Sequence, residues 1–265
     1  MQHIAIAIEG QAVTLEYEWI AGEREGAPLI VFLHEGLGSA AMWGGWPRAL
    51  CEAAGCRGLV FSRYGYGHSQ VRPASEDGWP VDYMEREARL HLPALFEALG
   101  IDCARERPVI FGHSDGATIA LLYAAAFPRH PGAVVVLAPH VFTEPVARER
   151  IARLQANWHD GRLASRLAKL HADPAGVFNG WSLCWLSPAF SGWNVAAAIE
   201  SIESPLLAIQ GRQDQFGTLE QLEEIQRRVP KAELLVLEDC RHVPHEEHPA
   251  AVLAAVAGFL ARSLA

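Results

Sequence analysis

Long hydrophobic runs and an excess of positive charge are both missing from this chain of 265 residues. Its longest stretch that is nearly free of charge, residues 108–128, is interrupted by small and polar residues that a membrane-spanning helix would not place there. Lys and Arg number 22 against 31 Asp and Glu, so the formal net charge is −9. We therefore expect no transmembrane helix, and we expect neither nucleic acid nor an anionic membrane surface as a partner.

Paired cysteines and a leader sequence are also missing. The five cysteines are scattered without the short paired spacings of a zinc site, which argues against a disulfide framework or a structural metal. The first ten residues alternate like a strand and lack a basic segment, a longer apolar core and a small-residue cleavage site. We expect a cytoplasmic protein whose cysteines are reduced and mostly packed inside.

What the chain does have is enough apolar material for a sizeable core, since 50% of its residues are hydrophobic and only 20% are charged. Apolar runs bounded by Gly and Pro predict eight strands, at 4–8, 13–19, 29–33, 58–61, 109–111, 133–138, 206–210 and 233–237. Helical periodicity predicts helices at 47–54, 81–99, 117–127, 219–229 and 250–264. This alternation predicts an α/β fold: an eight-stranded, mostly parallel sheet flanked by helices, with an antiparallel hairpin at one edge.

One interval, residues 140–204, has no strand pattern. Its leucines at 163, 167 and 170 recur at helical spacing, and it concentrates six large aromatic residues, Trp158, Phe178, Trp181, Trp185, Phe190 and Trp193. We predict a helical lid at 140–204, inserted after the sixth strand over a core formed by 1–139 and 205–265. Trp181 and Trp185 are candidates for lining a substrate pocket, although a lid also needs aromatic residues for its own packing.

The strongest motif is Gly112-His113-Ser114-Asp115-Gly116, which lies between a predicted strand and a predicted helix. A nucleophile on a sharp strand-to-helix turn needs small neighbours, and the helix N-terminus adds a positive dipole end that favours an oxyanion. Ser114 is therefore a candidate nucleophile. The alternative is an ordinary glycine-rich turn in which Ser114 caps the helix.

A serine at its ordinary pKa needs a base and an orienting acid. Asp214 follows the predicted strand 206–210, and His242 follows the next one, 233–237. Each residue alone could be an ordinary loop residue. The order Ser, Asp, His, with each residue after a strand end, instead predicts that Ser114, Asp214 and His242 act together.

With these motifs the chain resembles the α/β-hydrolase family over essentially its whole length. The resemblance implies that His34-Glu35-Gly36 is the oxyanion loop and that the amides of Gly36 and Asp115 form the oxyanion hole. Residues 62–69 are similar to the family's Asp-x-Arg-Gly-x-Gly-x-Ser turn. Two departures stand out, because Glu35 replaces the usual Gly after the loop histidine and Ser62 replaces the Asp.

Glu35 raises an electrostatic question. Two carboxylates, Glu35 and Asp115, would oppose an oxyanion if both pointed inward, since like charges at about 4 Å cost about 4 kcal/mol at an effective dielectric near 20. They must therefore point away or be paired, and Arg63 and His113 are the expected partners. Glu35 either braces its loop or contacts substrate or water in the pocket. His113 either packs behind the turn or lines the pocket as a second base.

The histidines at 242, 245 and 248 have a spacing that could suggest a metal site. We expect none, because prolines at 244 and 249 break the helix that would bring the three imidazoles together. No cofactor is required. The cationic row Arg162, Arg166 and Lys169 leaves an anionic substrate open, although such a row is more often a solvated surface.

The sequence thus predicts a serine hydrolase that cleaves a small carboxylic ester or thioester by acyl transfer through a Ser-His-Asp triad. Its partner is a small-molecule substrate, and the oligomeric state stays open. The resemblance also allows a C–C bond hydrolase or a lyase acting on an aromatic-pathway or menaquinone-type intermediate. A non-catalytic receptor for a small ligand is the alternative from a different class.

Overall fold

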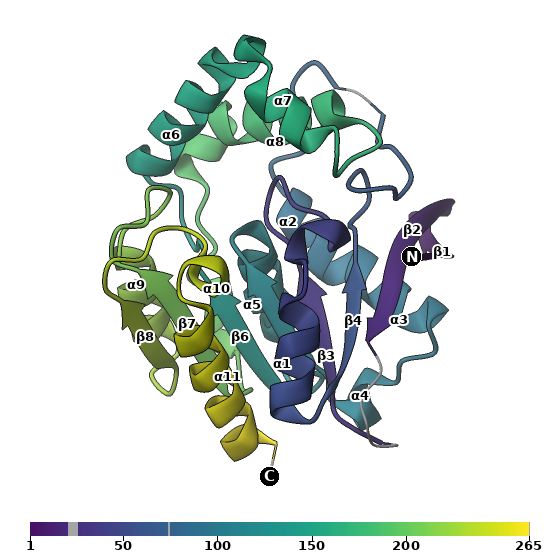
Figure 1. The fold of residues 1–265 in the computed structure, drawn as a ribbon, viewed down its shortest axis with the longest axis vertical. Coiled ribbons are helices and arrows are strands. Elements are labelled where there is room, and N and C mark those ends of the chain that lie inside the picture. Colours follow the sequence, from purple (N-terminus) through teal and green to yellow (C-terminus); the bar gives the residue numbers. More distant parts are fainter. Residues whose placement is uncertain (21–25, 74, 265) are drawn as a thin grey trace.

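One sheet runs through the molecule in the strand order β1-β2-β4-β3-β5-β6-β7-β8 (Figure 1). The structure, a computed structural model, describes residues 1–20, 26–73 and 75–264. Strands β1 and β2 form an antiparallel hairpin, β2 is antiparallel to β4, and the remaining pairs are parallel. The strands span Gln2–Ile8, Gln11–Ile20, Leu29–Leu33, Arg57–Phe61, Val109–His113, Ala133–Leu137, Leu206–Gly211 and Glu233–Leu237. The predicted fold class is confirmed.

The central strands β3, β5, β6 and β7 are buried at every position because helices cover both faces of the sheet. Alternate residues of β3, β5 and β6 divide between two cores. One core contains α1 (Trp46–Ala54) and α11 (Pro249–Ser263). The other contains α5 (Asp115–Ala126) and α9 (Glu220–Arg228). Because the strands between the two cores are parallel, their carboxyl ends, where the candidate residues lie, share one edge of the sheet.

The predicted helix 81–99 is interrupted. It consists of α2 (Tyr83–Arg86), a wider π-helical turn η2 (Glu87–His91) and α3 (Leu92–Ala98). Pro93 has no amide hydrogen to give to a carbonyl four residues earlier, which favours the wider turn just before it. A short helix α4 (Cys103–Glu106) follows that the sequence analysis missed, and the Asp102 carboxylate caps it by accepting from two backbone amides.

Helices fill the interval between β6 and β7. Figure 1 shows α6, α7 and α8 at the top of the molecule, above the sheet. The elements are α6 (Pro145–Ala156), η3 (Trp158–Asp160), α7 (Arg162–Leu167), α8 (Pro174–Leu186), η4 (Ala189–Gly192) and η5 (Ala198–Ser201). At the end of this interval, Ser201 Oγ donates a hydrogen bond of 2.9 Å to the carbonyl of Ala125 in α5. The division of the chain into a core and a lid at 140–204 stays a prediction.

Most aromatic residues of this interval pack among themselves. The rings of Trp158 and Phe178 stack with centroids 4.0 Å apart, and those of Phe190 and Trp193 stack at 5.0 Å. These contacts hold the helices to one another. Trp185 contacts the second pair, with its centroid 4.7 Å from that of Phe190.

The sequence predicted that the cysteines are mostly buried and that no helix spans a membrane. All five cysteines are free thiols and are buried. Among the helices of the described ranges, none has both the length and the apolar character needed to cross a bilayer.

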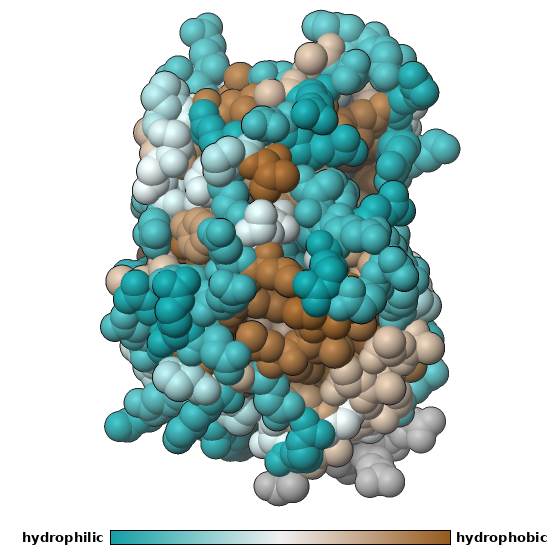
Figure 2. All heavy atoms as spheres, turned by 90° about the vertical axis from the view of Figure 1, so that its left-hand side faces the viewer, coloured by the Kyte–Doolittle hydropathy of each residue, from teal (hydrophilic) through white to brown (hydrophobic). Residues whose placement is uncertain are grey.

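The outer edge of the sheet is formed by β8, whose residues after Glu233 are only half-buried. Figure 2 looks onto this side of the molecule and shows apolar atoms gathered in its lower half among hydrophilic ones. Ion pairs lie at both ends of the strand, because Arg262 contacts Glu233 at 2.7 Å and Arg212 contacts Glu238 at 2.7 Å.

Arg148 in α6 ties this helix to the end of α8, and its removal gives a first prediction. Its guanidinium donates to the carbonyls of Trp185, Leu186 and Ser187, which have no partners inside their own helix. We expect Arg148→Leu to lower the free energy of unfolding by about 1–3 kcal/mol and to accelerate amide exchange in α8.

Hydrogen exchange followed by mass spectrometry measures this effect. Arg153→Leu is the control, because Arg153 lies on the same helix but is exposed and paired only with Glu149 at 3.8 Å. Equal exchange rates in α8 for the two variants would contradict the assignment of Arg148.

Candidate active site

Ser114 lies in the turn between β5 and α5 with φ 53° and ψ −119°, a region that residues with a side chain rarely adopt. Small neighbours permit this turn. A Cβ on Gly112 would lie 2.2 Å from the carbonyl oxygen of Gly116, so neither side of the turn has room for a larger residue. Such backbone strain accumulates at functional sites, where the surrounding structure maintains it.

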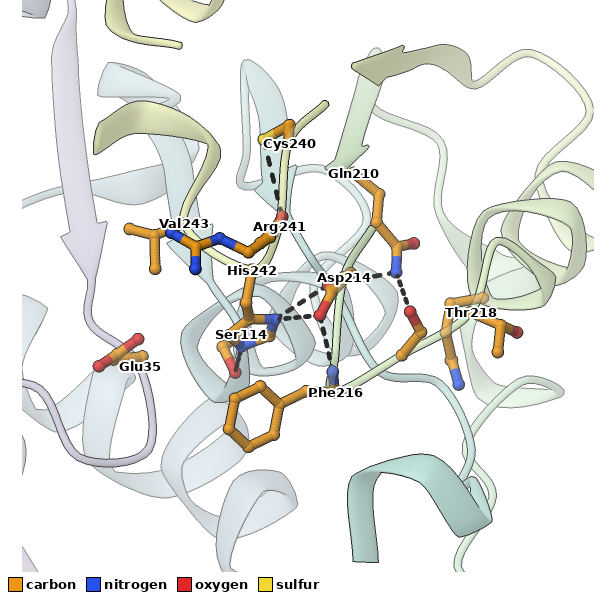
Figure 3. Close-up of polar contacts among 12 residues, drawn as sticks. Glu35, Ser114, Gln210, Asp214, Phe216, Thr218, Cys240, Arg241, His242 and Val243 are labelled. Atoms are coloured by element: carbon orange, nitrogen blue, oxygen red, sulfur yellow. Dashed lines mark hydrogen bonds and ion pairs between the residues drawn. The ribbon is translucent and has the colours of Figure 1, made fainter. Parts of the chain in front are cut away.

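The structure brings Ser114, His242 and Asp214 together (Figure 3). Ser114 Oγ lies 3.0 Å from His242 Nε2, and His242 Nδ1 lies 2.8 and 2.9 Å from the two carboxylate oxygens of Asp214. Asp214 follows β7 and His242 follows β8, as expected from the chain order. This is the geometry that a serine nucleophile, a base and an orienting acid require.

The loop around Asp214 fixes the carboxylate. The amide of Phe216 donates to Oδ1 at 2.8 Å, and Gln210 Nε2 donates to Oδ2 at 3.3 Å. Burial raises the pKa of Asp214, but the neighbouring His242 and the hydrogen bond from the Phe216 amide outweigh this effect and lower the pKa overall. Burial also lowers the pKa of His242, but the neighbouring Asp214 raises it by more. The pKa of the imidazole is therefore raised overall. The pair therefore favours an ionised acid beside an imidazole that readily accepts a proton.

Gly36 and Asp115, the expected oxyanion donors, line the same pocket as Ser114. Asp115 is the first residue of α5, so its amide has no partner within that helix. Its carboxylate is buried and accepts a hydrogen bond from the hydroxyl of Tyr83. Burial raises the pKa of Asp115, and the nearby Arg63 partly offsets that effect.

A buried arginine fixes the loop that carries Gly36. Arg63 has no exposed surface, and its Nη2 donates to the carbonyl of Glu35 at 2.9 Å. The ring of His34 donates from Nδ1 to the same carbonyl at 2.8 Å and accepts the amide of Arg63 at 3.1 Å. The guanidinium lies over the ring of Tyr66 at 4.2 Å. The backbone conformation at the loop is thus set by bonds from the neighbouring turn.

The structure also explains the departure at Ser62. Its hydroxyl donates to the buried Glu16 carboxylate at 2.5 Å and accepts the amide of Ala40 at 2.9 Å. The same oxygen of Glu16 accepts the amide of His68 at 2.9 Å. A carboxylate from β2 therefore occupies this turn, where the family's pattern has an aspartate at position 62.

The carboxyl group of Glu35 pairs with His113 and not with Arg63. Glu35 Oε2 lies 3.3 Å from His113 Nδ1, whereas Arg63 bonds only to the carbonyl of Glu35. Figure 3 shows Glu35 on the opposite side of the Ser114 and His242 pair from Asp214. The side chain is 19% exposed and lines the same pocket as Ser114. Burial raises the pKa of Glu35.

His113 lies outside the pocket lining, contrary to the prediction that it lines the pocket. Its Nε2 donates to the carbonyl of His242 at 2.7 Å, and its ring packs against that of His245 with centroids 5.0 Å apart. Burial lowers the pKa of His113 well below its ordinary value. The side chain lines a second cavity, of about 250 Å³, which it shares with Glu35.

The pocket above Ser114 has a volume of about 630 Å³ and is mostly apolar. Trp181 and Trp185 line it as predicted. The remaining lining residues that the sequence analysis did not single out are Leu37, His140, Ala147, Ile151, Leu154, Gln215, Phe216 and Val243. Neither lysine nor arginine belongs to the lining, and Arg162, Arg166 and Lys169 are exposed. The lining therefore offers no basic side chain to an anionic substrate.

His140 is the polar lining residue that sequence reasoning could have found. It follows β6 just after Ala138, whose φ of 47° turns the chain sharply at the strand end. Thr118 exchanges hydrogen bonds with the backbone of His140, at 2.6 and 3.2 Å. Burial lowers the pKa of His140 to about 4, so the ring is neutral at ordinary pH. The rule that identified Asp214 and His242, a polar residue after a strand end, applies here too.

One group of potential metal ligands is present among the described residues. Glu35, His113 and His242 bring one ligand atom each within 4.8 Å of one another. They do not form an open ligand set, because both nitrogens of His242 face Asp214 and Ser114 and Nε2 of His113 is bonded to a carbonyl. His245 belongs to the short helix α10 (Pro244–Glu247) and packs against Trp43 instead.

The chain is similar to known proteins in sequence and in fold. Residues 30–256 match the model of the alpha/beta hydrolase family. The chain is 25% identical over 270 residues to a 2-hydroxy-6-oxo-6-phenylhexa-2,4-dienoate hydrolase of Burkholderia cepacia, covering 91% of this chain and 89% of that protein.

Solved structures share the fold at low identity. A thermophilic esterase from Thermogutta terrifontis superposes with a TM-score of 0.73 and 19% identity, covering 99% of both chains. The enol-lactonase of Burkholderia xenovorans gives a TM-score of 0.72 and 21% identity, covering 97% of this chain and 99% of that one. With the match to the family model, we conclude that the chain belongs to the alpha/beta hydrolase family and is an enzyme of the hydrolase type.

Proposed function

We propose that this enzyme is a serine hydrolase that cleaves a small carboxylic ester through a Ser114, His242 and Asp214 triad. The observation that carries the proposal is the series of hydrogen bonds from Asp214 to His242 to Ser114, which ends at a pocket of about 630 Å³. A thioester has the same acyl carbonyl and is included in the proposal.

The reaction is an acyl transfer in two halves. Ser114 Oγ attacks the ester carbonyl while His242 Nε2 takes its proton, and the amides of Gly36 and Asp115 bind the resulting oxyanion. His242 then gives the proton to the departing alcohol, which leaves an acyl-enzyme. A water molecule attacks the acyl group with His242 as base, and the acid is released as Ser114 recovers its proton. Asp214 keeps Nδ1 protonated and stabilises the imidazolium in both halves.

The pocket favours a neutral, apolar acyl group. Its walls are formed by tryptophans 181 and 185 together with aliphatic residues of α6, and its lining contains neither lysine nor arginine. An anionic substituent would lose its hydration there without an oppositely charged partner.

Cleavage of a C–C bond is the second candidate, and the 25% identical relative from Burkholderia cepacia favours it. The substrate in that protein's name is a dienoate and hence an anion. The absence of lysine and arginine from this pocket's lining argues for an ester instead. A non-catalytic receptor is disfavoured, because binding alone would need neither the strained Ser114 backbone nor the His242 and Asp214 pair.

A panel of p-nitrophenyl esters and acyl thioesters tests the proposal. We expect turnover with medium-length or aromatic acyl groups, and we expect Ser114→Ala to reduce it by about 10⁴-fold or more because the nucleophile is lost. Ser165→Ala, an exposed serine of α7, is the matched control.

Labelling with a fluorophosphonate separates the alternatives. Labelling of Ser114 without ester turnover would move the assignment to C–C cleavage or elimination. Failure of both labelling and turnover would favour a binding protein.

The pH dependence gives a further prediction, because His242 must be neutral to accept the proton of Ser114. Its pKa is raised, since Asp214 outweighs the effect of burial, so kcat/KM falls as the pH drops through that raised value. Asp214→Asn should move this acid limb to lower pH and reduce kcat by about 10⁴-fold. Asp239→Asn, at an exposed residue of the loop after β8 that carries His242, serves as control. An unmoved acid limb in Asp214→Asn contradicts the assignment.

Gly36→Ala tests the oxyanion hole. A Cβ at this position would lie 2.3 Å from Trp181 Nε1, so the loop must shift and its amide moves with it. We expect kcat to fall by about 10²–10³-fold, the usual effect of losing one oxyanion donor. Gly45→Ala is the control, because its Cβ would meet nothing within 4 Å. A normal kcat in a folded Gly36→Ala enzyme excludes the Gly36 amide as donor.

A further inference from the structure

Glu35 separates two spaces in the protein. Its carboxyl group lines the pocket above Ser114 and also the second cavity, where His113 and His245 lie. It immediately precedes Gly36, whose amide the proposed function assigns to the oxyanion hole. The inference below rests on that function.

The proton on His113 can be placed from its contacts. Nε2 lies 2.7 Å from the carbonyl oxygen of His242, which can only accept, so Nε2 carries the hydrogen. A neutral imidazole has only one such hydrogen, which leaves a lone pair on Nδ1. That atom faces Glu35 Oε2 at 3.3 Å. Two lone pairs would repel each other there, and a proton between the two atoms would remove this repulsion.

The charges around the pair decide which atom carries that proton. His113 faces His242, His245 and His140, and burial together with these rings lowers its pKa well below the ordinary value. Burial raises the pKa of Glu35, and the carboxyls of Glu246 and Asp115 add to this effect, whereas His242 and Arg166 oppose it. Both effects favour a neutral histidine beside a protonated glutamic acid.

We propose that Glu35 is a positioning residue that keeps its proton and donates it to His113 Nδ1, so that His113 in turn fixes the main chain of the catalytic base. The resulting series runs from the Glu35 carboxyl through His113 to the carbonyl of His242. Glu35, at the start of this series, lies on the side of His242 opposite Asp214 (Figure 3).

The retained proton removes the electrostatic conflict at the oxyanion hole. A protonated Glu35 has no charge, so the loop that carries Gly36 brings no anion toward the negative charge that develops in the reaction. Loss of the proton would create that anion and would break the series to His242. Activity should therefore decline on the alkaline side as the pair ionises.

The second cavity borders the same pair, since both Glu35 and His113 line it. Its lining includes Ser39 Oγ, Trp43 Nε1 and His245 Nδ1, buried polar atoms with no hydrogen-bond partner within the described ranges. Polar cavities of this kind accommodate water.

Carbon-13 NMR of protein labelled at the glutamate carboxyl groups tests the protonation state without any substrate. We expect one carboxyl resonance to titrate well above the usual glutamate pKa of about 4.3 and to be missing from Glu35→Gln. Glu85, whose pKa burial also raises, should give a second such resonance that persists in the variant. If the missing resonance titrates in the ordinary range, the proposal is overturned, whatever the enzyme hydrolyses.

The pH profile of kcat/KM then tests the role in activity. For the wild-type enzyme we expect a decline of about tenfold per pH unit above the pKa of the pair, the slope for loss of one proton. Glu35→Gln keeps a donor toward His113 Nδ1 but has no proton to lose, so this alkaline decline should disappear. Glu35→Ala lacks the donor, and its kcat should be reduced at every pH, with KM little changed.

Glu246→Gln is the matched control, because this carboxyl also lines the second cavity but does not contact His113 within hydrogen-bond distance. Its alkaline decline should resemble that of the wild type. Circular dichroism establishes that each variant is folded. An alkaline decline that survives unchanged in folded Glu35→Gln would refute the positioning role.

Discussion

The site depends on one fully buried cation, the guanidinium of Arg63. Burial disfavours its charge, and the neighbouring Tyr66, Glu87 and Asp115 compensate, so its pKa is still raised. The guanidinium bonds to the carbonyl of Glu35 and thereby fixes the backbone just before Gly36. A buried charge is costly unless it is paired, so this arrangement is stable only when the loop and the helix start at Asp115 are both in place.

Tyr83 extends this connection to α8. Its hydroxyl donates to the carboxylate of Asp115 and accepts the indole N–H of Trp185 at 3.0 Å. The turn that carries Ser114 and the helix that closes the pocket are therefore joined through one side chain of α2. These bonds couple the pocket wall at Trp185 to the start of α5 at Asp115.

The sequence predicted the parts of the site that local patterns encode. Glycines around Ser114 and polar residues after two strand ends were enough to place Ser114, Asp214 and His242, because parallel strands direct their carboxyl ends to one edge. Strand and helix positions followed from hydrophobic periodicity in the same way, with α4 and the wider turn before Pro93 as the exceptions.

Partners that are distant in the sequence could not be predicted. Glu16 reaches Ser62 because β2 lies beside β4, and no local pattern encodes that contact. The sequence left both Arg63 and His113 open as partners of Glu35. Only the tertiary arrangement shows that Arg63 bonds to the backbone carbonyl of Glu35, whereas His113 contacts its carboxyl group. Adjacency in the sequence also did not predict the pocket lining, since His113 is next to Ser114 but lines the second cavity instead of the pocket.

The edge strand β8 has a consequence outside catalysis. Its half-buried leucines and valine would offer a neighbouring chain an apolar surface and unpaired backbone groups, the combination that leads to strand addition. The ion pairs at its two ends, Arg262 with Glu233 and Arg212 with Glu238, would have to lose their hydration first. These four charged side chains, which lie outside the candidate active site, therefore oppose the addition of a further strand at this edge.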